Sequence, residues 1–203
     1  MPIRDCQVVA VEGTAAGGKT TLVHALTAYY REQGVNVAAT GEPARVSPFM
    51  EEIVLHGKGE FDLTAELDAF AAQLSTTMRA ARNHSLLITD KTPANVVAYT
   101  RLLLDQGDPQ VRAVLRTMES LCNAWMPLAY SAVIHCRDQY DQAAGGDRFR
   151  GKVLDLQNAT ETAVYEAIRT TNVPIIDLPQ GLTTQARVEW IAKHLHLLGI
   201  NVH

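Results

Sequence analysis

The stretch that decides the fold class of this chain runs Gly13-Thr14-Ala15-Ala16-Gly17-Gly18-Lys19-Thr20. It matches the pattern G-x-x-x-x-G-K-[ST] in full, and it directly follows the apolar run Val-Val-Ala-Val at 8–11. A strand that enters a glycine-rich turn and then a helix aims successive backbone N–H groups, and the positive end of the helix dipole, at one point. The pattern therefore predicts a loop that binds the phosphates of a nucleotide, against the alternative of a chance glycine-rich turn between a strand and a helix.

The polar side chains of this loop have expected roles. Lys19 is expected to reach the β- and γ-phosphates, and the hydroxyl of Thr20 is expected to bind Mg²⁺. Glycine lets the backbone wrap closely around the phosphates. The residues predicted to contact the nucleotide here are Gly13, Thr14, Ala15, Ala16, Gly17, Gly18, Lys19, Thr20 and Thr21.

The whole chain is consistent with a single domain, 1–203, and its composition excludes several classes of protein. A net charge of −4 offers no basic surface for a nucleic acid polymer. No apolar run approaches the length of a membrane span, and the N-terminus lacks the apolar stretch of a signal peptide. The three cysteines are few and far apart, which predicts reduced thiols in a cytoplasmic protein without a zinc cluster.

The pattern of apolar residues alternates between short strands and longer helices. Strands are expected at 7–11, 35–39, 86–89, 132–135 and 174–177. Helices are expected at 19–33, 48–56, 64–83, 93–106, 109–125, 156–170 and 184–198. This alternation predicts an α/β fold with a doubly wound, parallel, five-stranded sheet. In such sheets ligands bind beyond the carboxyl ends of the strands, so the residues that follow each strand are the candidates for the site.

Charged residues gather at these positions. Glu42 and Arg45 follow the second strand, and Asp90 and Lys91 follow the third. Arg137 follows the fourth strand and precedes a polar, glycine-rich segment. Acids near a phosphate site suit metal binding or proton transfer, whereas bases neutralise charge.

On these residues the chain resembles the small P-loop nucleoside and nucleotide kinases, namely deoxynucleoside kinases, thymidylate kinases and nicotinamide-riboside-kinase-like ATPases. The features that carry the resemblance are the phosphate loop, Glu42-Pro43, Asp90-Lys91 and the arginines of a glycine-rich segment. The resemblance implies the P-loop kinase fold with a small lid, ATP and Mg²⁺ as cofactors, and a small-molecule phosphate acceptor as partner.

The resemblance gives Glu42 a catalytic role. In deoxynucleoside kinases a Glu-Pro pair at this place supplies a carboxylate that takes the proton from the 5′-hydroxyl of the substrate. Thymidylate kinases carry Arg-Glu-Pro there, and the arginine holds the phosphate of the acceptor. Gly41 occupies that position here, which argues against a monophosphate acceptor unless Arg45 substitutes. The alternative for Glu42 is a solvated loop acid before a turn proline.

Asp90 and Lys91 occupy the place of an Asp-Arg or Glu-Arg pair in the resembling families. Asp90 is expected to hold Mg²⁺ together with Thr20. Lys91 keeps the charge of the replaced arginine but not its bidentate fork, and it is expected to contact the 5′-oxygen or the transferring phosphate. A structural alternative also exists, because Asp90 or Thr92 before Pro93 would cap a helix.

Two further regions are expected to contact substrates. In the helix at 64–83 the families place a side chain that reads the base, and Gln73 and Phe70 are the candidates here, with a solvated glutamine and a core phenylalanine as alternatives. A lid is expected at about 137–151, in which Arg148 and Arg150 close on the β- and γ-phosphates. Arg137 is expected to stack on adenine or to join these arginines, and a mobile surface turn is the alternative to a lid.

Three functions remain open from the sequence. The first is a kinase that transfers the γ-phosphate of ATP to a hydroxyl of a nucleoside or nucleoside-like molecule. The second is the same fold acting on a nucleoside monophosphate or on an alcohol such as an antibiotic. The third is a regulatory nucleotide-binding protein with little turnover. The helices within 93–126 also offer apolar faces that suit a homodimer.

Overall fold

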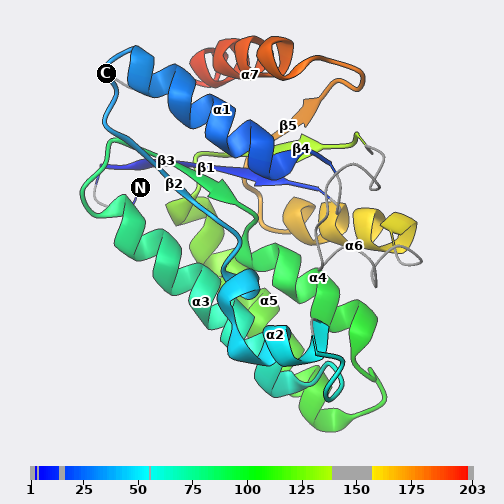
Figure 1. The fold of residues 1–203 in the computed structure, drawn as a ribbon. Helices are drawn as coiled ribbons and strands as arrows, with labels where there is room; N and C mark the ends of the chain where they lie inside the picture. The colour runs from blue at the N-terminus through cyan, green and yellow to red at the C-terminus, as the bar shows by residue number, and fades with distance from the viewer. Residues whose placement is uncertain (1–2, 4, 14–16, 55, 139–156, 201–203) are drawn as a thin grey trace.

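A computed structural model describes residues 3, 5–13, 17–54, 56–138 and 157–200 of this chain (Figure 1). Its centre is a five-stranded parallel sheet with the strand order β2-β3-β1-β4-β5. The strands are β1 (Gln7–Glu12), β2 (Val37–Thr40), β3 (Leu86–Asp90), β4 (Ala132–Cys136) and β5 (Ile175–Leu178). The predicted fold class is therefore confirmed, because every pair of neighbouring strands runs parallel.

Helices cover both faces of the sheet in two layers (Figure 1). One layer contains α1 (Lys19–Glu32) and α7 (Thr184–Leu197). The other contains α3 (Leu63–Ala81), α4 (Pro93–Leu103), α5 (Pro109–Ala129) and α6 (Gln157–Arg169). The short helices η1 (Pro43–Val46) and α2 (Pro48–Val54) follow β2 and pack with α3 beyond the edge of the sheet.

Strand alternation divides the core between these two layers. Successive side chains of a strand point to opposite faces. In β1, Val9 and Val11 pack in the cluster that contains α1 and α7, whereas Val8 and Ala10 pack in the cluster that contains α3 to α6. The same parity places Glu12, the last residue of β1, on the α4 side.

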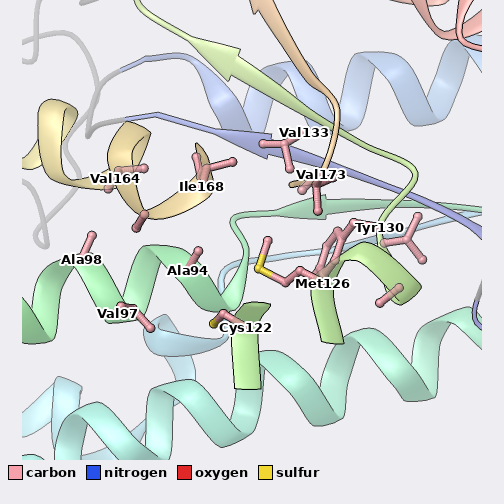
Figure 2. Packing of buried hydrophobic residues seen from close by; sticks show 14 of the residues in the cluster. Ala94, Val97, Ala98, Cys122, Met126, Tyr130, Val133, Val164, Ile168 and Val173 are labelled. Carbon is pink, nitrogen blue, oxygen red and sulfur yellow. The ribbon is translucent and has the colours of Figure 1, made fainter. Parts of the chain in front are cut away.

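The larger cluster lies beneath the strands where α4, α5 and α6 meet (Figure 2). Met126 of α5 and Ile168 of α6 are fully buried there, and Ala94 of α4 packs beside them. These contacts hold α4 against α6, so that the first turn of α4 is fixed near the carboxyl ends of β1 and β3.

Most predicted elements are present with ends shifted by one to three residues. The prediction for α5 was wrong at its end, because the helix runs through Pro127 to Ala129 instead of ending at 125. Proline disfavours a helix interior because it removes a hydrogen bond to the preceding turn and its ring clashes with a carbonyl there. Met126 and Ala129, on either side of Pro127, are nevertheless buried in the core, which favours continuation of the helix. The helix η1 was not predicted.

Two expectations concern the surroundings of the fold, namely a membrane and a second copy of the chain. No helix among the described residues is long and apolar enough to cross a membrane. The homodimer expected through 93–126 is not tested by a single chain, although Leu102 and Leu121 in that range are exposed.

Candidate nucleotide-binding and phosphoryl-transfer site

The phosphate loop begins at a glycine that no other residue can replace without distortion. Gly13 directly follows β1 and has a φ of 136°. A Cβ atom at this position would lie 2.2 Å from the carbonyl oxygen of Cys136 at the end of β4. The loop therefore starts by packing its backbone against the neighbouring strand. Residues 14–16 lie outside the described part of the chain.

The loop ends at the first turn of α1. Gly18 is the N-cap residue and has a left-handed φ of 71°. Lys19 follows and is 7% exposed. Burial, and then the positive charge of Lys91, lower the pKa of Lys19. A bound polyphosphate would reverse this effect, because negative charge near Lys19 stabilises its ammonium form.

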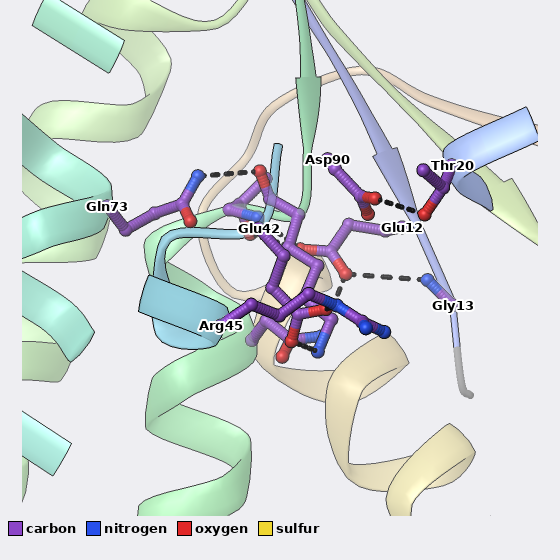
Figure 3. Close-up of polar contacts among 10 residues, drawn as sticks. Glu12, Gly13, Thr20, Glu42, Arg45, Gln73 and Asp90 are labelled. Carbon is purple, nitrogen blue, oxygen red and sulfur yellow. Dashed lines mark hydrogen bonds and ion pairs between the residues drawn. The ribbon is translucent and has the colours of Figure 1, made fainter. Parts of the chain in front are cut away.

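Thr20 and Asp90, the two predicted Mg²⁺ ligands, meet at the carboxyl ends of the strands. Thr20 Oγ1 donates a hydrogen bond to Asp90 Oδ2 at 2.8 Å (Figure 3). Asp90 Oδ1 is buried and has no hydrogen-bond partner among the described residues. A hydroxyl beside a carboxylate with a spare oxygen is the kind of donor set that Mg²⁺ prefers. These two residues therefore fit the Mg²⁺ ion that a bound nucleoside triphosphate would carry.

The capping alternative for Asp90 is not what the structure shows. The N-cap of α4 is Thr92, and Asp90 is the last residue of β3. The Thr92 hydroxyl makes no capping bond either, because it donates to Glu12 instead.

Glu42 lies in a cluster of opposite charges. Lys91 Nζ lies 2.6 Å from Glu42 Oε1, and Arg45 Nε lies 2.9 Å from Glu42 Oε2 (Figure 3). Burial alone would raise the pKa of Glu42, but the charge and hydrogen bond of Lys91, and then the charge of Arg45, lower that pKa to about 2. Glu42 is thus held as a carboxylate, and it is not the freely solvated acid of the alternative.

The backbone of Lys91 is strained and held by its neighbours. Its φ of 73° is left-handed, which is uncommon for a residue other than glycine. Its N–H donates to the carbonyl of Val11, and its carbonyl accepts bonds from Thr89 Oγ1 and Gln73 Nε2, both at 3.0 Å. Such strain persists where the surrounding structure over-determines it, and it is typical of functional sites.

Glu12 is a site residue that the sequence analysis missed. It is fully buried, and Glu12 Oε1 accepts hydrogen bonds from both the backbone N–H and the hydroxyl of Thr92, each at 2.6 Å. Glu12 Oε2 accepts from Asn95 Nδ2 at 2.9 Å and lies 3.4 Å from the backbone nitrogen of Gly13. Burial raises the pKa of Glu12. An acid that ends a strand otherwise apolar after Gln7, one residue before the loop, was the signal that could have identified it.

The two candidates for reading a base differ in their surroundings. Gln73 is buried and donates to the Lys91 carbonyl, so it is not the solvated glutamine of the alternative. Phe70 is 5% exposed and packs in the core cluster with Ala94 and Val97. The structure therefore brings Gln73 to the site, whereas the contacts of Phe70 are those of a core residue.

A cavity lies beyond the ends of β4 and β5. It has a volume of about 560 Å³ and is lined by Arg137, Asp138, Glu161 and Gln180. Arg137 Nε lies 3.7 Å from Glu161 Oε1. The expected lid lies outside the described residues from position 139 onward, and so do Arg148 and Arg150.

A family model for the AAA domain matches residues 8–187, which is most of the chain. The chain belongs to this AAA domain family. No curated protein sequence matches the chain significantly.

Solved structures share its fold. Thymidylate kinase from Candida albicans has a TM-score of 0.66 at 15% identity, over 95% of this chain and 92% of that one. Deoxyadenosine kinase from M. mycoides has a TM-score of 0.61 at 17% identity, over 95% and 100%. NadR protein in complex with NR has a TM-score of 0.73 at 17% identity, over 99% of this chain and 54% of that one. The resemblance to P-loop nucleoside and nucleotide kinases is therefore confirmed at the level of the fold.

Proposed function

We propose that this protein is an ATP-dependent kinase that transfers the γ-phosphate to a hydroxyl group of a nucleoside or nucleoside-like small molecule. The observation that carries the proposal is the ion pair of Glu42 with Lys91, at 2.6 Å. Lys91 directly follows Asp90, which bonds Thr20 of the phosphate loop. The Glu42 carboxylate is thus linked through Lys91 to the residues expected to bind the triphosphate. A protein that only binds nucleotide does not require a carboxylate there.

The proposed reaction assigns the proton of the acceptor to Glu42. The acceptor hydroxyl oxygen bonds to the γ-phosphorus while the bond to the β–γ bridging oxygen breaks and ADP leaves. Because this transition state is loose, the hydroxyl becomes acidic late in the transfer. A carboxylate with a pKa of about 2 can accept a proton at that stage, and Lys91 keeps it ionised until then.

Positive charge on the other side of the γ-phosphate comes from the loop. Lys19 would neutralise the β- and γ-phosphates from the first turn of α1. Thr20 and Asp90 would hold Mg²⁺, which when bound neutralises further charge on the phosphate oxygens. Arg148 and Arg150 would close on the phosphates from the lid.

The acceptor is proposed to be a nucleoside because the position before Glu42 carries no positive charge. The space around Gly41 is open, since a Cβ built there meets no atom within 4 Å. Packing therefore does not exclude an arginine at this position. One observation favours a monophosphate as a second candidate, namely that the Arg45 side chain is 38% exposed beside Glu42 and would meet an acceptor phosphate there.

The proposal also includes a cytoplasmic location, which the three free, buried cysteines support.

The test is transfer of label from γ-labelled ATP to a panel of nucleosides and their 5′-monophosphates. We expect transfer that depends on a nucleoside, and we expect Glu42→Gln to slow it roughly a hundredfold to ten-thousandfold at unchanged ATP affinity. Glu51→Gln, at a half-exposed position of α2, is the matched control. Preference for monophosphates would establish the second candidate, and ATP turnover that ignores every acceptor would favour a regulatory protein.

A further inference from the structure

A buried arginine on α7 contacts the backbone of the phosphate loop. The Arg187 side chain is 3% exposed. Its Nη1 donates to the carbonyl oxygen of Gly17 at 3.5 Å, and its Nε donates to the carbonyl oxygen of Leu182 at 3.1 Å. Its Nη2 lies 2.5 Å from Asp138 Oδ2. Arginine is rarely this buried unless its charge is paired, and Asp138 supplies that partner here.

Asp138 connects this contact to the cavity beyond β4 and β5. It follows β4, and its Oδ1 accepts a hydrogen bond from the backbone N–H of Gly181 at 2.9 Å. The neighbouring Gln180 donates from Nε2 to the carbonyl of Arg137 at 2.9 Å. The segments after β4 and β5 are thereby joined, and Asp138 lines the cavity of about 560 Å³ that they form.

The orientation of Gly17 decides what the phosphate loop offers to a ligand. In a trans peptide the carbonyl of one residue and the N–H of the next point in opposite directions. Because Arg187 holds the Gly17 carbonyl, the Gly18 N–H points away from α7. A Gly17 carbonyl released from Arg187 is free to turn toward the phosphates, where it would repel them and remove one donor.

We propose that Arg187 and Asp138 are positioning residues for the phosphate donor. Arg187 orients the Gly17–Gly18 peptide so that its N–H faces the polyphosphate. Asp138 pairs with Arg187 and lines the cavity that would receive the base, so it links this peptide to that cavity through Arg187. The inference rests on the proposed function, because it takes a nucleoside triphosphate as the donor.

The experiment compares binding of ATP and of inorganic tripolyphosphate by titration calorimetry. Arg187→Lys keeps the charge but loses the planar fork, so we expect both ligands to bind at least about tenfold more weakly, the effect of one charge-assisted hydrogen bond. Asp138→Asn is a milder variant that leaves Arg187 without its ion pair, and we expect a loss in the same direction. Gln180→Ala is expected to weaken ATP binding and to leave tripolyphosphate binding unchanged.

A steady-state measurement separates positioning from a general loss of structure. We expect Arg187→Lys to raise the KM for ATP at least about tenfold and to leave the KM of the acceptor unchanged. Wild-type affinity for tripolyphosphate in both Arg187→Lys and Asp138→Asn would overturn the inference, and so would an equal rise in the KM of the acceptor. If the wild-type protein binds ATP but phosphorylates no acceptor, the proposed function fails while the binding comparison still decides the role of Arg187. If it binds no ATP, both fail.

Discussion

Glu12 and Thr92 join the end of β1 to the first turn of α4, because the backbone N–H and the hydroxyl of Thr92 both donate to one carboxylate oxygen of Glu12 at 2.6 Å. Gly13, the first glycine of the phosphate loop, directly follows Glu12, and Lys91 directly precedes Thr92. A single buried side chain therefore fixes the predicted phosphate loop relative to the lysine that pairs with Glu42.

We predict that Glu12→Gln destabilises the fold. Glutamine keeps the shape of the side chain but replaces one acceptor oxygen with a donor amide, which would face the donors of either Thr92 or Asn95. Leaving buried donors unpaired costs about 1–3 kcal/mol each. Urea unfolding of both proteins measures the difference, with Thr92→Ser as the control that retains the hydroxyl. Equal stability of Glu12→Gln and the wild type would show that this linkage is not important.

We predict that stability falls as pH rises because of a buried acid on α3. Glu66 is 1% exposed and accepts one hydrogen bond from Thr100 Oγ1 at 3.1 Å, while its Oε1 has no partner among the described residues. Burial raises the pKa of Glu66 to about 7, from 4.5, although Thr100 and Lys91 counteract part of the shift.

The sign follows from proton binding. Between pH 4.5 and about 7 the folded protein holds a proton on Glu66 that the unfolded chain has released, so stability falls over this range. The full cost, on the order of 3 kcal/mol, is present above pH 7. Glutamine resembles the protonated acid, so Glu66→Gln should remove this part of the pH dependence. Unfolding free energies at pH 5 and pH 8 decide the matter, and parallel behaviour of the two proteins would contradict it.

We predict that Lys19→Ala severely weakens use of Mg²⁺-ATP. The variant loses the compact positive charge at the start of α1, and the expected fall in rate is on the order of a hundredfold or more. ATP affinity and turnover are measured in a variant shown to be folded. Lys193→Ala, at an exposed position of α7, is the matched control. Wild-type values for Lys19→Ala would refute the assignment of the phosphate loop.

We predict that Arg148→Ala and Arg150→Ala slow phosphoryl transfer more than they weaken binding of the acceptor. Their charge matters most as the phosphate leaves ADP, so their effect falls on the transition state. Single-turnover kinetics separate the two steps, with Arg116→Ala at an exposed position of α5 as the control. Normal transfer in both lid variants would mean that the segment is a surface loop.

The sequence made the glycine-rich loop, the parallel sheet and the proximity of Thr20 to Asp90 predictable. Each of these depends on a local pattern: a motif with fixed spacing, an apolar run, or an acid at the end of a strand. The bond from Thr20 to Asp90 joins the start of α1 to the end of β3. The closeness of these two residues could be predicted because parallel strands bring their carboxyl ends together.

Contacts between side chains distant in the sequence were not predictable in the same way. Lys91 pairs with Glu42, which lies 49 residues away, and Gln73 bonds the strained backbone of Lys91, 18 residues away. The contacts of Glu12 and Arg187 were not predicted because neither residue belongs to a motif, and their partners lie 80 and 170 residues away.

The sequence by itself determined which chemical groups this protein carries and which of them follow each strand. Hydrophobic periodicity and glycine spacing reveal these positions because they are local properties of the chain. Only the tertiary structure decided which of these groups form ion pairs and hydrogen bonds with one another. The packing of α4 and α7 against the sheet buries Glu12 and Arg187, and burial is what forces each to find a partner. Glu12 therefore bonds Thr92 and Asn95 at the start of α4, and Arg187 bonds Gly17 and pairs with Asp138.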